Sequence, residues 1–465
     1  MFKKLFKIST LVVCIACSLF AFAGCNRGLT GGPALNDYVY GNGGLAVVKG
    51  DYVYYVNGYT SYSNITEAGQ NKQGSVKKSS IYRTKLENGR IAYTYNEKDT
   101  EQKYAHTLTK TEQVVSKVAG HENAGLYIFD NYIYYSSPNT DKDNSGTVKN
   151  EYLDFYRCKL DGTGNTHLFK TQAYSSNQSY TFSKIDNTVY LICYDGTNLN
   201  IINTSNKSKK TISESVTSVA YNKQTNYFAT SHTVSEMEKY VFYACANEDE
   251  KAGGNVLAKV NIVTGVSSTI DNSNAYTYTL YGMANDNVVY SRKSKLDNSA
   301  NPIIYSYNGS QHTELYSLVF DNIYVVESSS TAFMGIIGTS KSDIHFVSAN
   351  GTAVEIFSGS TTVLAISNNS VYVLNENNEI IKVDILAPET QIKVSGNATV
   401  DTTNTKYLSV ASSYAFFFAT YESENGSSYY LNMSNTTAIE NNECTPYFIG
   451  LFNSEDKPTE VYENE

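Results

Sequence analysis

Histidine is scarce in this sequence, and the short motifs that mark many enzymes are missing. Only 6 of the 465 residues are histidine, and no two of them lie at the spacing that zinc ligands use. We find no G-x-S-x-G elbow, no P-loop and no dinucleotide-binding G-x-G-x-x-G after a strand. The sequence therefore gives no support to the hydrolases, nucleotide-binding enzymes and zinc enzymes that carry these patterns.

Cysteine is also infrequent, and none of the cysteines beyond the N-terminal segment forms a C-x-x-C pair. An exported protein can form disulfides, but these residues are far apart and lie in apolar, strand-like contexts. We predict buried free thiols rather than one or two disulfides, with the pairing left open. The residues concerned are Cys158, Cys193, Cys245 and Cys444.

Positive charge is in deficit. The formal net charge is −9, and it becomes −12 without residues 1–24, which hold three lysines and no acidic residue. Phosphate repels an acidic chain, so nucleic acid is excluded as a partner. After residue 24 there is no convincing helical periodicity and no apolar run long enough to cross a bilayer.

The N-terminus has the pattern of an export signal. MFKKLFK is basic, and an apolar run follows from Ile8 to Ala23. Phe22-Ala23-Gly24-Cys25 resembles the lipobox of bacterial lipoproteins, although Phe22 replaces the more usual leucine. The resemblance implies cleavage after residue 24, diacylation of Cys25, and an extracytoplasmic protein anchored to the bacterial cell membrane by two acyl chains. An ordinary signal peptide or an uncleaved anchor is the alternative.

What the sequence does contain, repeatedly, is a polar turn followed by alternating apolar and aromatic residues. From Tyr54 to Phe416, successive aromatic anchors are about 52 residues apart on average, which is close to the length of one propeller blade. The copies are GDYVYY (Gly50), DNYIYY (Asp130), DNTVYL (Asp186), EKYVFY (Glu238), DNVVYS (Asp286), DNIYVV (Asp321), NNSVYV (Asn368) and SSYAFF (Ser412).

Each copy is preceded by a short strand pattern, and most are followed by a hairpin pattern with Asn-Gly, Asp-Gly or a similar turn. Four strands per unit predict an all-β fold, a β-propeller of four-stranded antiparallel blades. We count eight blades. Seven is the alternative, because the Asp321 motif is one residue short and the last unit lacks a clear hairpin. The C-terminal strand is expected to close the ring near the N-terminus.

These repeats resemble the tyrosine-rich units of DUF5050-type bacterial β-propellers, which are similar to the low-density-lipoprotein-receptor type. The match to G-D-x-[IV]-Y-Y … [IL]-Y-R-x-x-x-D-G is sharpest at residues 50–55 with 81–83, and at 131–135 with 155–157 and 161–162. The resemblance spans nearly the whole chain but is defined by fold, so it implies little about function.

The expected organisation is a signal peptide (1–24), a Gly/Asn-rich tether (25–44), one propeller domain (45–452) and a flexible acidic tail (453–465). Variable insertions follow the anchor strands at 57–79, 137–152, 247–254 and 292–302. We expect them on one face of the ring, where loops on a rigid scaffold usually bind partners, although simple tolerance of insertions would look the same. Candidate binding residues there are Tyr59, Tyr62, Tyr152 and Arg292.

A partial calcium motif lies in the second insertion. Asp141, Asp143 and Ser145 match the first half of an EF-hand-type loop, but Lys149 and Tyr152 stand where later ligands belong. A polar hairpin tip is the preferred interpretation, and no cofactor is expected. His167, His312 and His345 fall on blade strands, where we expect satisfied structural histidines.

Together these features predict a non-catalytic, membrane-anchored binding or scaffold module for an envelope protein or glycan. The alternative is a glycan-active hydrolase or lyase on the same scaffold, which would need paired carboxylates near the ring axis. The sequence does not pair any.

Overall fold

The computed structural model places most of the described chain in β-strands, and all but one of the strand pairs in the described chain are antiparallel. It describes residues 29, 31–57, 80–87, 90–91, 93–95, 106–108, 111–115, 119, 125–139, 141, 143–146, 152–171, 179–212, 215–229, 233–246, 255–273, 275–284, 286–297, 299–317, 320–326, 335–340, 342–402, 408–423 and 426–449. Within these ranges the single helical element is a 3-10 turn, η2 (Met237–Lys239). No helix among the described residues has the length and apolar character needed to cross a membrane.

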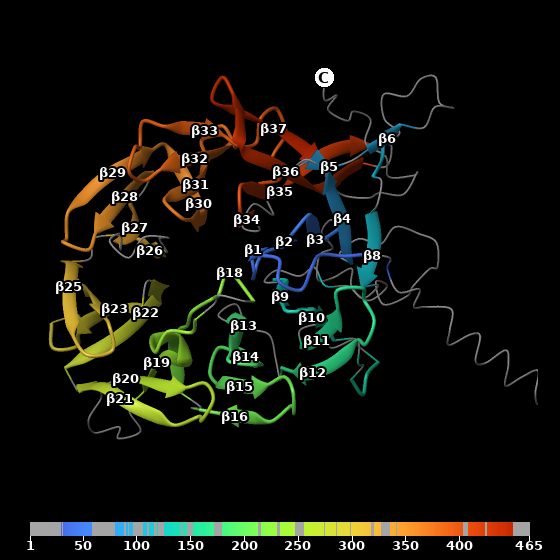
Figure 1. Ribbon diagram of the computed structural model, residues 1–465. Helices are drawn as coiled ribbons and strands as arrows, with labels where there is room; N and C mark the ends of the chain where they lie inside the picture. Colours follow the sequence, from blue (N-terminus) through green and yellow to red (C-terminus); the bar gives the residue numbers. More distant parts are fainter. Residues whose placement is uncertain are drawn as a thin grey trace, which may run out of the picture.

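Eight four-stranded units follow one another around a ring, so the protein is a β-propeller (Figure 1). Blade one contains β2 (Ala46–Lys49), β3 (Tyr52–Val56), β4 (Ile81–Glu87) and β8 (Thr111–Val115). Two short strands are added to it: β1 (Val39–Tyr40) pairs with β2, and β5 (Arg90–Ile91) pairs with the C-terminal end of β4. Blade two contains β9 (Tyr127–Phe129), β10 (Tyr132–Pro138), β11 (Leu153–Lys159) and β12 (Thr166–Lys170). The pair β6 (Tyr93–Tyr95) and β7 (His106–Leu108) forms a separate ribbon.

The middle blades have the same plan. Blade three is β13 (Ser179–Ile185), β14 (Thr188–Tyr194), β15 (Leu199–Asn203) and β16 (Lys209–Thr211). Blade four is β17 (Val216–Ala220), β19 (Tyr240–Ala246), β20 (Asn255–Asn261) and β21 (Ser267–Ser273). Blade five is β22 (Tyr276–Ala284), β23 (Asn287–Ser294), β24 (Ile303–Tyr307) and β25 (His312–Ser317).

The last three blades complete the ring. Blade six is β26 (Asn322–Val326), β27 (Gly335–Ser340), β28 (Asp343–Ser348) and β29 (Ala353–Ser358). Blade seven is β30 (Ser360–Ser367), β31 (Ser370–Asn375), β32 (Ile380–Asp384) and β33 (Gln391–Lys393). Blade eight is β34 (Ser409–Ala411), β35 (Tyr414–Ser423), β36 (Gly426–Glu440) and β37 (Glu443–Phe448).

The repeated polar turn joins the first and second strands of most blades. Its first residue has a positive φ, the conformation that Gly, Asn and Asp tolerate best and that two-residue hairpins need. The residues that adopt it are Gly50, Asp130, Asp186, Asp286, Asn368 and Ser412. The strand that follows is the tyrosine-rich anchor strand, so the spacing of the motif sets the spacing of the blades.

Two sequence expectations need correction. The Asp321 copy does not precede a second strand: it leads into β26, the first strand of blade six, and the second strand is β27. In blade one, the segment after Asn88-Gly89 supplies only the short β5, and the outer strand is β8. Blade eight, in contrast, does have a closing hairpin, because Asn441 and Asn442 both adopt positive φ between β36 and β37.

The tyrosine and arginine positions of the repeat form a cation–π contact inside a blade. Arg83 lies over the ring of Tyr52, and Arg157 lies over the ring of Tyr132, each at 5.2 Å. Each arginine lies on the third strand of its blade and pairs with the anchor tyrosine of the second strand, Arg83 with Tyr54 and Arg157 with Tyr134. Such contacts contribute about 0.5–1 kcal/mol each at exposed sites, which gives a physical reason for both residues in the motif.

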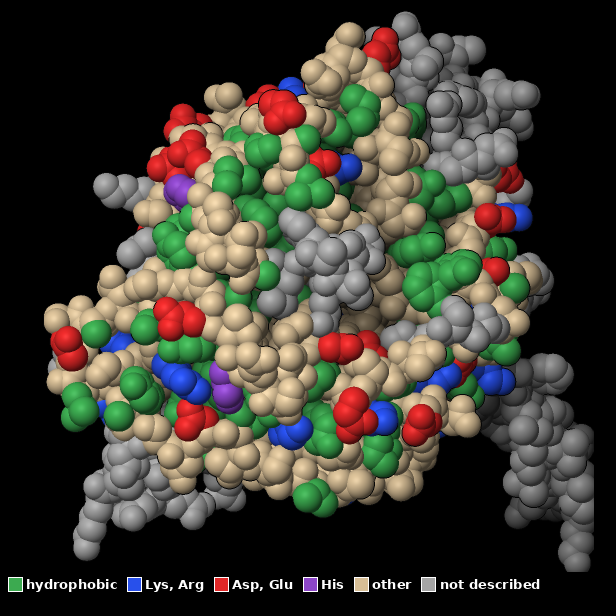
Figure 2. Space-filling view, turned by 60° about the vertical axis from the view of Figure 1, so that its left-hand side comes forward, with side chains coloured by type: hydrophobic (Ala, Val, Ile, Leu, Met, Phe, Trp, Pro, Cys, Tyr) green, Lys and Arg blue, Asp and Glu red, His purple; other side chains and the backbone are tan. Residues whose placement is uncertain are grey.

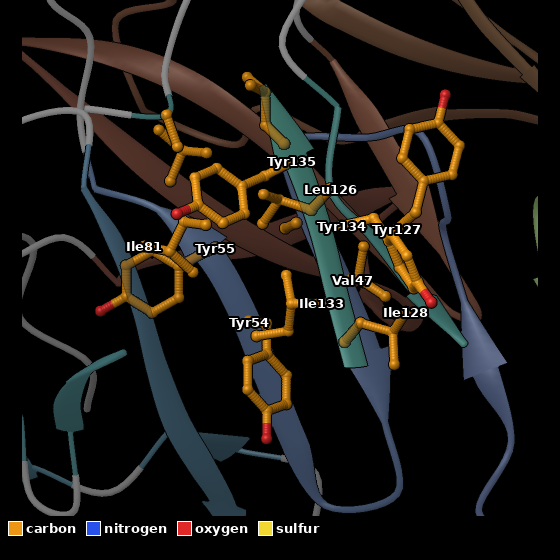
Figure 3. Close-up of a cluster of buried hydrophobic side chains, with 14 of the residues drawn as sticks. Val47, Tyr54, Tyr55, Ile81, Leu126, Tyr127, Ile128, Ile133, Tyr134 and Tyr135 are labelled. Atoms are coloured by element: carbon orange, nitrogen blue, oxygen red, sulfur yellow. The ribbon is translucent and has the colours of Figure 1, made fainter. Parts of the chain in front are cut away.

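Neighbouring blades are packed through their apolar faces. A cluster of valine, isoleucine, tyrosine and phenylalanine side chains from blades one, two and three continues into blade eight through Phe416, Phe418 and Leu431. Figure 3 shows the part that joins blades one and two, with Val47 and Tyr54 on one side and Ile133 and Ile128 on the other. Blade eight therefore contacts blade one through side chains, and no strand pair joins these two blades in the described chain.

Tight turns add a second contact between blades. The turn between the third and fourth strands of a blade packs against the outer strand of the preceding blade. A glycine is the turn residue that comes closest to that strand. A Cβ on Gly162 or Gly351 would lie less than 3.0 Å from the backbone oxygen of Val114 or Leu315, respectively. Glycine at these turns thus supplies both a positive φ and the space for a neighbouring strand.

A short strand pair links blade one to blade four. β18 (Asn226–Tyr227), part of the connection between β17 and β19, pairs with β1, and both lie near the centre of the ring (Figure 1). The buried Asn42 side chain donates to the carbonyls of Ile128 and Gln224, each at 3.3 Å, and accepts from the Ile128 amide at 2.8 Å. The connection is therefore fixed to blades one and two.

An ion pair extends this link. Lys184 of blade three donates to the carboxylate of Asp130 at 2.6 Å and to the Tyr227 hydroxyl at 2.8 Å, and that hydroxyl donates to Asp130 at 3.0 Å. The connection that carries β18 therefore touches blades one, two and three as well as its own blade.

The N-terminal part of the described chain is held against blade one. Arg83 donates to the carbonyl of Gly31 at 3.1 Å, and the buried Lys49 ammonium donates to the carbonyls of Leu35 and Asp37. Much of the segment expected to act as a tether is thus docked on the ring. The part nearest Cys25, and the tail from 453 to 465, lie outside the described residues.

Cys158, Cys193, Cys245 and Cys444 are free thiols, as predicted, but Cys245 is partly exposed whereas the other three are buried. Burial raises the pKa of Cys158 to about 12 and that of Cys444 to about 11. Thiols with such pKa values are protonated at neutral pH and unreactive in the folded state.

Candidate functional site

The four insertions expected from the sequence all lie between the second and third strands of their blades. They join β3 to β4, β10 to β11, β19 to β20 and β23 to β24. Because the strands of each blade are antiparallel, these connections leave the ring at the same end, which we call the loop end. Tyr59 and Tyr62 fall outside the described residues, whereas Tyr152 and Arg292 can be placed.

Tyr152 lies at the loop end of blade two, beside an ion pair. The Lys170 ammonium is 5.7 Å from the centre of the Tyr152 ring and donates to the Asp141 carboxylate at 2.6 Å. The hydrogen bond from Lys170 to Asp141 raises the pKa of that lysine. The structure therefore brings Tyr152 and Asp141, two residues singled out in the sequence, to one lysine.

The partial calcium motif is folded into a turn. Asp143 accepts from the amide of Ser145 at 2.8 Å and from its hydroxyl at 2.6 Å, while Asp141 is directed to Lys170. Within the described residues, no group of three or more His, Cys, Asp or Glu side chains could hold a metal ion. The preference for a polar hairpin tip over a calcium site stays a prediction.

A nearly buried carboxylate lies beside this turn. Asp154 accepts from the side-chain amide of Asn139 at 2.6 Å, and its other oxygen is 2.8 Å from Nε2 of His167. The edge of the His167 ring lies against Tyr156, with the ring centres 5.2 Å apart. Both carboxylate oxygens of Asp154 are thus occupied, and His167 is a partnered strand histidine, as expected.

The other two strand histidines differ from each other. His312 accepts or donates a hydrogen bond of 2.7 Å with the Tyr290 hydroxyl, and burial together with the nearby Arg292 lowers its pKa. His345 lies on β28 beside Phe320, but its Nδ1 is buried and has no hydrogen-bond partner in the described part of the chain. The expectation of a satisfied histidine is therefore correct at position 312 and wrong at position 345.

Arg292 lies on β23 and not in the loop that follows it. Its guanidinium forms an ion pair of 2.9 Å with Asp271 on blade four and stacks on the Tyr305 ring at 4.6 Å. Its side chain is 21% exposed. In this arrangement Arg292 joins two neighbouring blades.

A hollow of about 240 Å³ opens at the loop end between blades two and three. Phe169 and Thr171 line one side, from β12 and the residue after it. The opposite side comes from β14, β15, β16 and the connection that follows β14, and is lined by Cys193, Asp195, Asn198, Asn200, Lys209 and Thr211.

The polar side chains that line this hollow differ in whether their hydrogen-bonding atoms have partners. The Asp195 carboxylate accepts from the amides of Thr197 and Asn198 and so caps its own loop. Asn200 is 4% exposed and accepts from the Thr211 hydroxyl at 2.9 Å, which leaves its amide nitrogen without a partner in the described chain. The Lys209 ammonium lies 5.5 Å from the Phe169 ring centre and has no hydrogen bond or ion pair among the described residues.

The sequence did not indicate this hollow. Its two walls come from different blades, so its shape depends on how the blades pack. Neither the short connection after β14 nor a lysine on a short edge strand is unusual in a chain of this composition. In hindsight, the sequence feature that points to the hollow is the pair of adjacent lysines Lys209 and Lys210. Lys210 donates to backbone carbonyls of blade four, whereas Lys209 forms no such hydrogen bond in the described chain.

The face shown in Figure 2 carries mixed charge. On the side turned forward in Figure 2, acidic and basic side chains alternate along the lower rim, and hydrophobic side chains are scattered among polar ones. No single-sign charged face is visible there.

No family model and no curated protein matches this sequence. Among solved structures, the propeller domain of the Trilobed protease from Pyrococcus furiosus is similar over 74% of this chain and 95% of that chain, with 10% identity and a TM-score of 0.40. TolB from Acinetobacter baumannii covers 56% of this chain and 62% of its own, with 11% identity and a TM-score of 0.32. An oligogalacturonate lyase in complex with manganese covers 65% and 85%, with 11% identity and a TM-score of 0.38. Values at this level carry no inference about activity.

Proposed function

We propose that the protein is a lipid-anchored, extracytoplasmic propeller that binds an envelope protein or glycan without catalysing a reaction. The observation that carries the proposal is the common exit of four insertions at the loop end of a rigid ring. Variable loops on a rigid scaffold are a frequent way to build a binding surface. The carboxylates of Asp154 and Asp195 at this end are held by hydrogen bonds from their own surroundings, as suits structural rather than catalytic groups.

The binding surface is tested by shortening the insertions. Val56 pairs directly with Ile81, and Pro138 with Leu153, so an Asn-Gly turn can replace residues 57–80 and 139–152 without moving the strands. The chain from Asn26 onward is immobilised and exposed to envelope extract and to a glycan array. We expect a partner that the intact chain captures and the shortened chain loses.

A matched control shortens the opposite end. Val326 pairs directly with Gly335, so residues 327–334, between the first and second strands of blade six, can also become Asn-Gly. This variant should capture the partner unchanged. Capture that survives loss of the insertions would overturn the assignment of the loop end, and turnover of a glycan by the intact chain would favour the hydrolase or lyase alternative.

The anchor is tested separately. Replacing Cys25 by alanine removes the thiol that would carry the two acyl chains. We expect the intact chain to incorporate labelled fatty acid in the expressing bacterium and the variant to lose the label. The control is Cys14→Ala, inside the proposed signal peptide, which should keep the label. A Cys25→Ala protein that is still labelled would contradict lipidation at this residue.

A further inference from the structure

The hollow between blades two and three contains hydrogen-bond donors that have no partner in the described chain. The Lys209 ammonium has no carboxylate partner in the described chain, and the amide nitrogen of Asn200 has none either. The Thr171 hydroxyl accepts from the Leu153 amide at 2.9 Å, so its proton remains available for donation. Asp195, the one acid in the lining, is occupied by its own loop.

The donor on Asn200 is the most informative of these groups. The side chain is 96% buried, since only 4% is exposed, and the Thr211 hydroxyl fixes its orientation by donating to its oxygen. Asn200 is one of the residues that line the hollow, and its amide nitrogen has no partner in the described chain. This donor is therefore free to meet water or a ligand there.

The size and walls of the hollow restrict the ligand. A volume of about 240 Å³ is below the range of about 300–1,000 Å³ that drug-sized ligands occupy, so the ligand is small. Phe169, on the blade-two side, supplies an apolar surface, while Lys209 and Asn200 lie on the blade-three side. A molecule with an acceptor group at one end and an apolar face at the other fits this division.

We propose that this hollow binds the carboxylate of a small molecule of about monosaccharide size, with Lys209 and Asn200 as the recognising side chains. An ammonium and an amide donor together favour an anionic oxygen pair over a neutral acceptor, because hydrogen bonds to charged groups are roughly twice as strong as neutral ones. An acidic sugar and the end of an acidic peptide share this chemistry. The site is separate from the insertions and does not depend on the function proposed above.

Isothermal titration of the chain from Asn26 onward with glucuronate, glucose and N-acetylglutamate tests the proposal. Glucose controls for the sugar ring without its carboxylate, and N-acetylglutamate supplies the carboxylate without the sugar. We expect one or both acids to bind, glucose not to bind, and added salt to weaken binding because an ammonium at the surface is screened. Which acid binds more tightly identifies the source of the carboxylate.

Two variants locate the binding. Lys209→Gln removes the cation, and Asn200→Asp keeps the oxygen that Thr211 needs while replacing the free donor by a negative charge. Each should weaken binding of the acid at least tenfold, with an unchanged melting temperature for Lys209→Gln showing that the fold is intact. Lys207→Gln makes the same charge change in the turn between β15 and β16, at the opposite end of the blade, and should have no effect. Absence of binding by both acids, or binding that is equal in the Lys209→Gln and Lys207→Gln variants, would overturn the proposal.

Discussion

Replacing Gly162 by alanine will lower the free energy of unfolding by about 3 kcal/mol. Gly162 has a φ of 80° in the turn between β11 and β12, where an L-residue is strained by roughly 1–2 kcal/mol. The new methyl group would also meet the backbone oxygen of Val114 on the preceding blade at less than 3.0 Å. A backbone strand cannot rotate away as a side chain can, so blades one and two must separate.

The matched control lies two residues further along the same turn. Gly164 has a φ of 66°, but nothing lies within 4 Å of the position of its Cβ. Gly164→Ala should therefore show the backbone strain alone, with a loss of about 1 kcal/mol. Chemical denaturation of both variants measures the difference. Equal losses would mean that the contact between the blades contributes nothing to stability.

Replacing Arg83 by methionine will lower the free energy of unfolding by about 3 kcal/mol. The guanidinium is 1% exposed, lies 2.7 Å from the carboxylate of Glu112 and donates to the carbonyl of Gly31. Methionine keeps most of the apolar volume but leaves Glu112 without its cation. The Glu112 side chain is 31% exposed, so partial solvation keeps the loss near the lower end of the range for buried pairs.

The repeat itself provides the control for this variant. Arg157 has the same place in blade two and stacks on Tyr132 at the same 5.2 Å, but it has no carboxylate partner in the described chain and is only half buried. Arg157→Met should cost about 1 kcal/mol or less, as measured by the same denaturation experiment. If the two variants lose the same stability, the tyrosine contact and not the ion pair accounts for the effect of Arg83.

The architecture could be predicted because its determinants are local. A polar turn that favours positive φ, followed by alternating tyrosine and valine, specifies a hairpin without knowledge of the rest of the chain. The Asp321 copy shows the limit of this approach. Its composition fits a blade strand equally well in the first or the second position, and only the pairing of β26 with β27 decides which it is.

The features that bring distant segments together could not be predicted. β18 has two residues and therefore no periodicity, and its pairing with β1 depends on where blade four stands in the ring. The hollow with Asn200 and Lys209 is likewise a product of two blades. Arg83 was visible as part of the repeat, but its burial arises from the docking of Gly31, which the sequence placed in a tether.

The pairing of β1 with β18 has a consequence for how the chain is made. Asn42 and its partner Gln224 are separated by 182 positions, and a ribosome adds about 5–20 residues per second. Blade one therefore emerges many seconds before the segment that completes it, and its inner edge must wait unpaired while blades two and three and the first strand of blade four are synthesised. An unpaired edge strand is a site of incorrect pairing. The two residues of β1 are too few to pair strongly with another strand, which limits incorrect pairing at this edge during that wait.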